Sequence, residues 1–492
     1  MSRGRVAALV AGALALAAQT WLTPEAARVG FAEQRQPSSQ PQEQPPQKPV
    51  IRVEANFVRV DVYPTADGRP VEDLRAEDFE ILEDGVRQTI ETFEHVRVTP
   101  TPSSLRVEPR SVAEGRSMAE NPRARIFVVF LDTGHVADDA SHAIRRPLVN
   151  LLERILGRDD LFALMTPEMS AADLTLARRT EGLDEMLGRH WTWGKRHDLI
   201  LTDPEEQKYE LCYPDIQGGT CSVPGIARQM ILRRREKIAL DALRDLVRYL
   251  GGLREERKAV IVVSNGWVLY RPDPRLASVI DPLCREIPGR PGIYVGPGGR
   301  LTTDPPHRDP RAPSRYECDA ARLALAQIDN ESEFRDLLME ANRANVSFYP
   351  VDPRGLAAWD HPIGPAPPPP PEVDHAELRN RRLVLETMAE TTDGLAVLTT
   401  NDLDRGLRRI SDDLSSYYLI GYYSTDARLD GRYRRITVRV KRPGVQVRAR
   451  RGYRAATREE VVSVRAGAAA SAPAVSRVQA ALGSLAGLRP ER

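Results

Sequence analysis

Two patterns of apolar residues divide the chain. Continuous apolar runs at 126–131 and 259–264 are typical of strands buried on both faces, as in parallel sheets covered by helices. Apolar residues at helical spacing predict helices at 138–156, 236–250, 331–345, 378–391 and 403–414. Further strands are expected at 161–166, 174–178, 346–351 and 395–398. Strands that alternate with amphipathic helices predict an α/β fold with a doubly wound, mostly parallel sheet of the Rossmann type.

The segments on both sides of this α/β region show the period-two alternation of half-buried strands. Near the N-terminus the pattern predicts strands at 51–62, 79–82 and 88–93. These strands are too few to be stable alone. Near the C-terminus the same pattern predicts strands at 417–423, 436–440 and 445–450. We therefore predict one antiparallel β-sandwich built from both chain ends, with the α/β domain inserted between them.

Composition supplies the remaining boundaries. Two arginines, an apolar run at 6–18 and small residues in an A-x-A arrangement predict a signal peptide at 1–18. The run is shorter than a membrane-spanning helix requires, so cleavage is favoured over an uncleaved anchor. The predicted order is then a Pro/Gln-rich linker at 19–50, an N-terminal β segment at 51–98, the α/β domain at 124–415, a C-terminal β segment at 416–454 and a flexible tail at 455–492. Insertions at 191–225, 267–316 and 359–373 interrupt the α/β domain.

The bulk properties narrow the choice of partners and location. With 492 residues and 41% hydrophobic content, the chain can form two or three domains with cores of their own. The net charge is +1 and the basic clusters are short and interleaved with acids, so nucleic acid is not an expected partner. No segment after the signal peptide is apolar enough to cross a bilayer. We expect an exported protein that resides in the periplasm, on the cell surface or in the medium.

Four cysteines in an exported chain predict disulfides rather than catalytic thiols. Cys212 and Cys221 flank one loop rich in Pro and Gly, and Cys284 and Cys318 flank another. Pairing of Cys212 with Cys221 and of Cys284 with Cys318 would close each loop with a disulfide of its own. The crossed pairings remain open, because four cysteines allow three connectivities.

The candidate chemistry centres on Asp132, the acid that follows the apolar run at 126–131. Open α/β sheets bind ligands at the carboxyl ends of their strands, which is where this acid is expected. His135 is interpreted as a polar surface residue, paired with His142. Ser264 follows the second core strand without a recognisable acid and base around it, and the turn at 352–354 is expected to add a charge pair nearby. No G-x-S-x-G, H-E-x-x-H or phosphate-loop signature occurs.

Six stretches in this order resemble the bacterial, acidobacterial-type von Willebrand factor A-related domain proteins. They are VRVDVYPTADGRPVEDLRAEDFEILEDGVRQTIETFEHV, IFVVFLDTGHV, LRDLVRYLGGLREERKAVIVVSNGW, ANRANVSFYPVDPRGL, TTDGLAVLTTNDLDRGLRRISDDLSSYYLIGYY and ITVRVKRPGVQVRARRGY. The resemblance covers most of the chain from 51 to 454. It implies a von Willebrand A-like α/β domain that serves adhesion and protein binding and is not an enzyme.

Many domains of this type hold Mg²⁺ or a similar ion through a D-x-S-x-S loop, a Thr and a later Asp, because such ions prefer hard oxygen ligands. Here Asp132 matches the first Asp, but Gly134 and Val136 stand in place of the two serines. Asn265 stands where the later Asp is often found, and the Thr has no counterpart. The resemblance therefore implies a degenerate metal site with no cofactor. Asp132 is then expected to cap the following helix region or to hold the turn by accepting backbone hydrogen bonds.

Two alternatives follow from the same residues. The first is a working metal-dependent adhesin that binds Mg²⁺, Ca²⁺ or Mn²⁺, with Asp132 as its first ligand. The second is a hydrolase or another enzyme built on the insertions. The favoured interpretation is a non-enzymatic interaction or adhesion module with an unidentified protein partner.

Overall fold

The computed structural model describes most of the chain after residue 56. The described residues are 57–66, 68–121, 123–181, 183, 185, 203–213, 225–254, 256–278, 294–295, 299–302, 313–361, 368–459 and 461–462. The predicted signal peptide and linker, parts of the three insertions and most of the tail lie outside them. The described part is a mixed α/β structure with one parallel sheet and two antiparallel sheets, besides a short two-stranded pair.

The parallel sheet has four strands in the order β11-β8-β6-β7, which are Val346–Val351, Lys258–Val263, Ile126–Leu131 and Leu161–Met165. Every residue of β6, β8 and β11 is buried, as the continuous apolar runs predict. The two weakest predicted strands are only single bridges, from Phe162 to Ala177 and from Val351 to Val397.

Helices cover both faces of the parallel sheet. Phe127, Val129 and Leu131 of β6 share a core with α2 and α10, which are Asp138–Ile155 and Leu403–Ser415. The alternate residues of β6 face a second core, formed with α5, α8 and α9, which are Ile226–Leu253, Asn330–Arg343 and Pro371–Thr391. The helices α5 and α9 begin earlier than predicted, and α9 reaches into the insertion expected at 359–373.

The two antiparallel sheets combine strands from both chain ends. One sheet has the order β14-β1-β12-β5, which are Gln446–Ala449, Phe57–Ala66, Ser416–Tyr423 and Ile90–Arg97, with β2 (Arg69–Pro70) beside β1. The other has the order β15-β13-β3-β4, which are Gly452–Arg454, Tyr433–Val440, Phe79–Glu83 and Val86–Gln88. The two sheets share one hydrophobic core. The predicted pairing of the two chain ends is thus confirmed.

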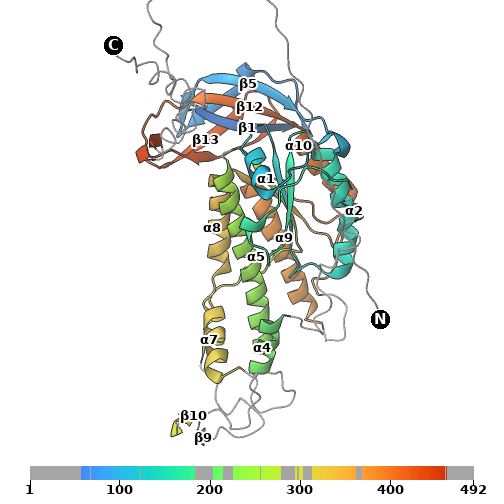
Figure 1. Cartoon of the computed structure of the whole chain (residues 1–492), viewed down its shortest axis with the longest axis vertical. Coiled ribbons are helices and arrows are strands. Elements are labelled where there is room, and N and C mark those ends of the chain that lie inside the picture. Colours follow the sequence, from blue (N-terminus) through green and yellow to red (C-terminus); the bar gives the residue numbers. More distant parts are fainter. Residues whose placement is uncertain are drawn as a thin grey trace, which may run out of the picture. The chain divides into compact units, whose positions relative to one another are not determined.

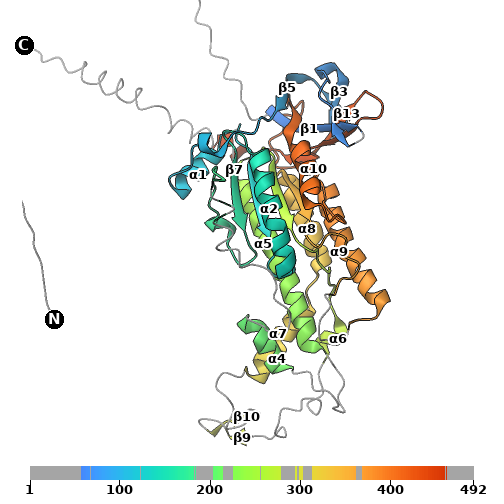
Figure 2. The same ribbon diagram turned by 90° about the vertical axis from the view of Figure 1, so that its right-hand side faces the viewer.

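The first two predicted insertions meet on the N-terminal part of α5. Their helices α4 (Pro204–Cys212), α6 (Pro274–Ala277) and α7 (Arg315–Ala326) share a small core with α5. Figures 1 and 2 show α4 and α7 at the opposite end of the α/β layers from strands β1, β5 and β13. The two insertions therefore form one module rather than two separate loops.

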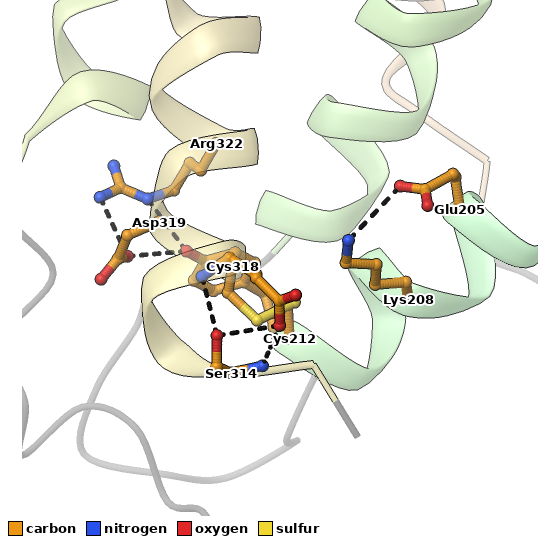
Figure 3. The surroundings of a disulfide bond; sticks show 9 residues. Glu205, Lys208, Cys212, Ser314, Cys318, Asp319 and Arg322 are labelled. Carbon is orange, nitrogen blue, oxygen red and sulfur yellow. Dashed lines mark hydrogen bonds and ion pairs between the residues drawn. A yellow bond between two sulfur atoms is a disulfide. The ribbon is translucent and has the colours of Figure 1, made fainter. Parts of the chain in front are cut away.

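A disulfide joins Cys212 of α4 to Cys318 of α7, 106 residues apart in sequence (Figure 3). Of the pairings that the sequence left open, the structure therefore has a crossed one and not the pairing within each loop. The physical reason is that both cysteines lie on helices that pack against α5, which brings their Cα atoms to 5.6 Å. Cys221 and Cys284 lie outside the described residues.

The remaining elements are short. A helix, α1 (Val112–Ala119), interrupts the segment that we expected to be a polar linker, and β9 (Tyr294–Val295) pairs with β10 (Leu301–Thr302). Three-residue 3₁₀ helices lie at Ala76–Asp78, Ser103–Leu105 and Ala171–Asp173. None of the helices in the described ranges combines the length and apolarity that a membrane crossing requires.

Candidate functional site

The strand order places the end of β6 at the point where the sheet topology reverses. From β6 the chain passes to β7 on one side, and β8 lies on the other side of β6. The loops that follow β6 and β8 therefore diverge at their carboxyl ends, which is where open α/β sheets bind ligands. Asp132 follows β6 and Ser264 follows β8, so both lie at this point. We call this part of the molecule the sheet edge.

The carboxylate of Asp132 is fully buried, and its two oxygens accept hydrogen bonds from the protein itself. Its Oδ2 accepts from the Ser264 hydroxyl at 2.6 Å and from the Trp267 indole Nε1 at 2.9 Å. Its Oδ1 lies 2.8 Å from Nδ1 of His135. The expectation that this carboxylate accepts backbone hydrogen bonds is therefore wrong, because the side chains of Ser264, Trp267 and His135 enclose it.

His135 bridges two buried carboxylates, and its side chain is only 7% exposed. Its Nε2 lies 3.1 Å from Oε2 of Glu236, a residue of α5 that is itself 1% exposed. Burial lowers the pKa of His135, but Asp132 and then Glu236 outweigh it and raise the pKa to about 9. At neutral pH the ring is therefore an imidazolium. The expectation that His135 is a surface residue paired with His142 is wrong; His142 lies in an exposed position 3.8 Å from Asp138.

An ion-pair network continues from Glu236 across the sheet edge. Arg381 of α9 lies 3.6 Å from Glu236 and 3.0 Å from Asp360. Arg354 lies 2.9 Å from Asp360 and 2.9 Å from Asp352, the acid at the end of β11. Burial opposes the charged forms of both arginines, yet the acids around them raise their pKa values. The expected charge pair after β11 is present and belongs to this network.

Of the other positions of the degenerate metal site, only Asn265 keeps an oxygen that could serve an ion: its Oδ1 is buried and accepts no hydrogen bond among the described residues. Gly134 has no side chain, and Val136 is buried in the core beneath α2. The amide nitrogen of Asn265 donates to the His135 backbone oxygen at 2.8 Å. Both oxygens of Asp132 accept hydrogen bonds, and a charged ring lies against it. These residues do not fit a divalent cation.

One group with the spacing of metal ligands occurs in the described part of the chain, formed by Asp360, His361 and Glu377. Both oxygens of Asp360 are bonded to arginines of the network. An Nη of Arg228 lies 2.7 Å from Nε2 of His361, and because arginine only donates, Nε2 must accept. The ring proton then resides on Nδ1, which lies 3.3 Å from Asp374. This group is an ion-pair cluster rather than a metal site.

Ser264, Asp132 and His135 form one hydrogen-bonded chain, but in an order that does not suit a nucleophile. The serine hydroxyl donates to the carboxylate and accepts from the Gly266 amide at 3.0 Å, and it is fully buried. The imidazole contacts two carboxylates and not the serine. A catalytic serine needs the imidazole as its direct hydrogen-bond partner. The geometry provides no such base for Ser264.

Sequence reasoning missed Glu236, Trp267 and Arg381, which complete the surroundings of Asp132 and His135. Glu236 has the one available signal, because it is an acid at the start of a predicted amphipathic helix, at a position that faces the core. Nothing in the local sequence marks Trp267 or Arg381 as its neighbours.

No protein-family model, no curated protein and no solved structure matches this chain. The function is therefore argued from the sheet edge and the motifs alone.

Proposed function

We propose that this chain is an exported, non-enzymatic protein-binding module of the von Willebrand A type that works without a metal ion. The observation that carries the proposal is the His135 ring between the buried carboxylates of Asp132 and Glu236. An imidazolium there supplies the positive charge that these acids need. The sequence motifs and the parallel sheet with helices on both faces support the assignment to this type of domain.

If the His135 imidazolium stands in place of a metal ion, a protein partner cannot bind in the way that a metal-dependent site allows. A metal-dependent adhesion site needs an open coordination position that a partner's carboxylate can fill. Here the central carboxylate is enclosed, and its neighbours Ser264 and Trp267 are fully buried as well. A partner therefore binds to another surface of the molecule, and binding does not depend on divalent ions.

Export is the second part of the proposal. The predicted signal peptide supports it, and so does the disulfide between Cys212 and Cys318, because disulfides persist mainly in oxidising compartments. The periplasm, the cell surface and the medium all meet this condition.

The test is an affinity capture from envelope extracts with the oxidised full chain, performed with and without a chelator. We expect the same partner to be retained with and without chelator. Adding Mg²⁺, Ca²⁺ or Mn²⁺ should not change the retained amount. Capture that disappears with chelator and returns with one of these ions would support the metal-dependent alternative instead. A chain with Asp132→Asn serves as the control, since it alters the sheet edge while conserving side-chain size.

A further inference from the structure

A cavity of about 50 Å³ lies between the β-sandwich and the amino-terminal end of the parallel sheet. Strands β1 and β12 line one side, and the residues just before β6 and β8 line the other. This is the opposite end of the sheet from Asp132. One water molecule requires roughly 10–15 Å³ on the same measure, so the cavity has room for a group of several heavy atoms.

Four arginines line the cavity, which are Arg59, Arg125, Arg254 and Arg257. Arg125 is paired with Asp160 at 2.5 Å. Arg59 and the nine-tenths buried Arg254 share a single carboxylate, that of Glu256, at 3.4 and 3.8 Å. These three guanidinium groups therefore have only two carboxylates between them.

The fourth arginine, Arg257, makes its side-chain hydrogen bonds to neutral groups, while Asp61 and Asp393 act on it electrostatically. It donates to the Tyr349 hydroxyl at 3.1 Å and to the Asp393 backbone oxygen at 2.6 Å, and it stacks over the Tyr63 ring at 4.1 Å. The one remaining acid in the lining is Asp61. In the lining, four guanidinium groups face the two carboxyl groups of Asp61 and Glu256, while Asp160 pairs with Arg125 from outside the lining.

Two of the arginine donors are also unsatisfied. The Nε atoms of Arg254 and Arg257 are buried and have no hydrogen-bond partner among the described residues. A buried donor without an acceptor is costly, and arginine binds oxyanions through several parallel N–H groups. The guanidinium groups outnumber the carboxyl groups of the lining, and two of their donors lack acceptors; both facts favour an anion with oxygen acceptors.

We propose that this cavity binds a small oxyanion, a phosphate or a carboxylate group, held by Arg254, Arg257 and Arg59. The anion contacts residues of the sandwich and of the parallel sheet at once, so it joins the two. The site is independent of the sheet edge and of any protein partner.

Inorganic phosphate is the first probe, titrated calorimetrically into the full oxidised chain at constant ionic strength set with chloride. We expect saturable binding of one phosphate per chain. Arg254→Gln and Arg257→Gln should each weaken it by about tenfold or more, because each removes charge-assisted hydrogen bonds. Arg248→Gln is the matched control, since Arg248 lies on α5, which ends just before Arg254, but is 64% exposed and pairs with Glu340. The phosphate affinity of the Arg248→Gln variant should equal that of the wild type.

Acetate and sulfate titrations distinguish the two sources of the anion. Binding of phosphate and sulfate without acetate indicates a phosphate-type ligand, and binding of acetate indicates a carboxylate. If the buried variants do not fold, Arg59→Gln decides, since Arg59 is 47% exposed at the rim and its loss should still weaken binding. The proposal is overturned if none of the three anions binds saturably, or if Arg59→Gln and Arg254→Gln bind as tightly as Arg248→Gln.

Discussion

Replacing His135 by glutamine should destabilise the chain by about 3 kcal/mol at pH 6.5. Burial lowers the pKa of the ring while Asp132 and Glu236 raise it, and the net result is a pKa of about 9 against an ordinary value of 6.5. A rise of about 2.5 in the pKa stabilises the folded state by about 3 kcal/mol, because a change of one in the pKa corresponds to about 1.36 kcal/mol. Removing one partner of a buried ion pair typically costs about 3–5 kcal/mol, which is a similar magnitude.

The pH dependence of this effect has a definite sign. Because the pKa of His135 is higher in the folded state, its contribution is fully present below about pH 6.5, the ordinary pKa of histidine, and is lost as the pH rises through about 9. The wild type should therefore lose about 3 kcal/mol of this contribution between pH 6.5 and the region above 9. The glutamine variant lacks the titrating ring, so the two proteins should approach each other in stability at high pH.

The assay is denaturant unfolding at pH 6.5, 8 and 9.5, followed by the fluorescence of the five tryptophans, among which the buried Trp267 contacts the same carboxylate. His142→Gln is the matched control, since that ring is 52% exposed and its removal should change stability little. The reasoning is refuted if His135→Gln unfolds at the same denaturant concentration as the control at pH 6.5. It is also refuted if the difference in stability between the wild type and His135→Gln is as large at pH 9.5 as at pH 6.5.

Three further outcomes follow from the packing. Peptide mapping without reductant should recover Cys212 linked to Cys318. Recovery of either cysteine linked within its own loop would contradict the fold of the α4–α7 module. Replacing both cysteines by serine should lower the free energy of unfolding by about 2–5 kcal/mol. Trp267→Phe should cost about 1.5–3 kcal/mol in urea unfolding, because it removes one hydrogen bond to a charged group. Gly394→Ala should lower the melting temperature by several degrees, since a Cβ would overlap the backbone of β11, whereas Gly252→Ala, with open space around it, should not.

The elements of this fold that depend on local pattern were predictable. The apolar run at 126–131 specifies a strand buried on both faces, and β6 is fully buried. The period-two segments at the two ends had too few strands to stand alone, which required that they pair. The start of α5 was not predictable in the same way, because Arg228 and the arginines at 233–235 read as a charged cluster. In the structure Arg233 is buried and Arg235 pairs with Glu206 of α4 at 2.6 Å.

The candidate site was predictable only in its position. Asp132 marks the sheet edge because it directly follows the central strand. Its partners come from far along the chain: Glu236 is carried by α5, and Ser264 and Trp267 follow β8. Residues so distant in sequence meet only after the sheet forms, so the burial of His135 between two acids has no local signature. The same reason explains why the disulfide joins two insertions 106 residues apart.

Calorimetric titration of the full chain with Mg²⁺, Ca²⁺ and Mn²⁺ at neutral pH tests the central claim most directly. Because the imidazolium of His135 lies against Asp132 and the carboxylate oxygens already accept hydrogen bonds, we predict no saturable binding at the sheet edge at millimolar ion concentrations. Saturable binding of one ion per chain that Asp132→Asn abolishes, while His142→Gln leaves it intact, would contradict the account and restore a working metal-dependent adhesion site.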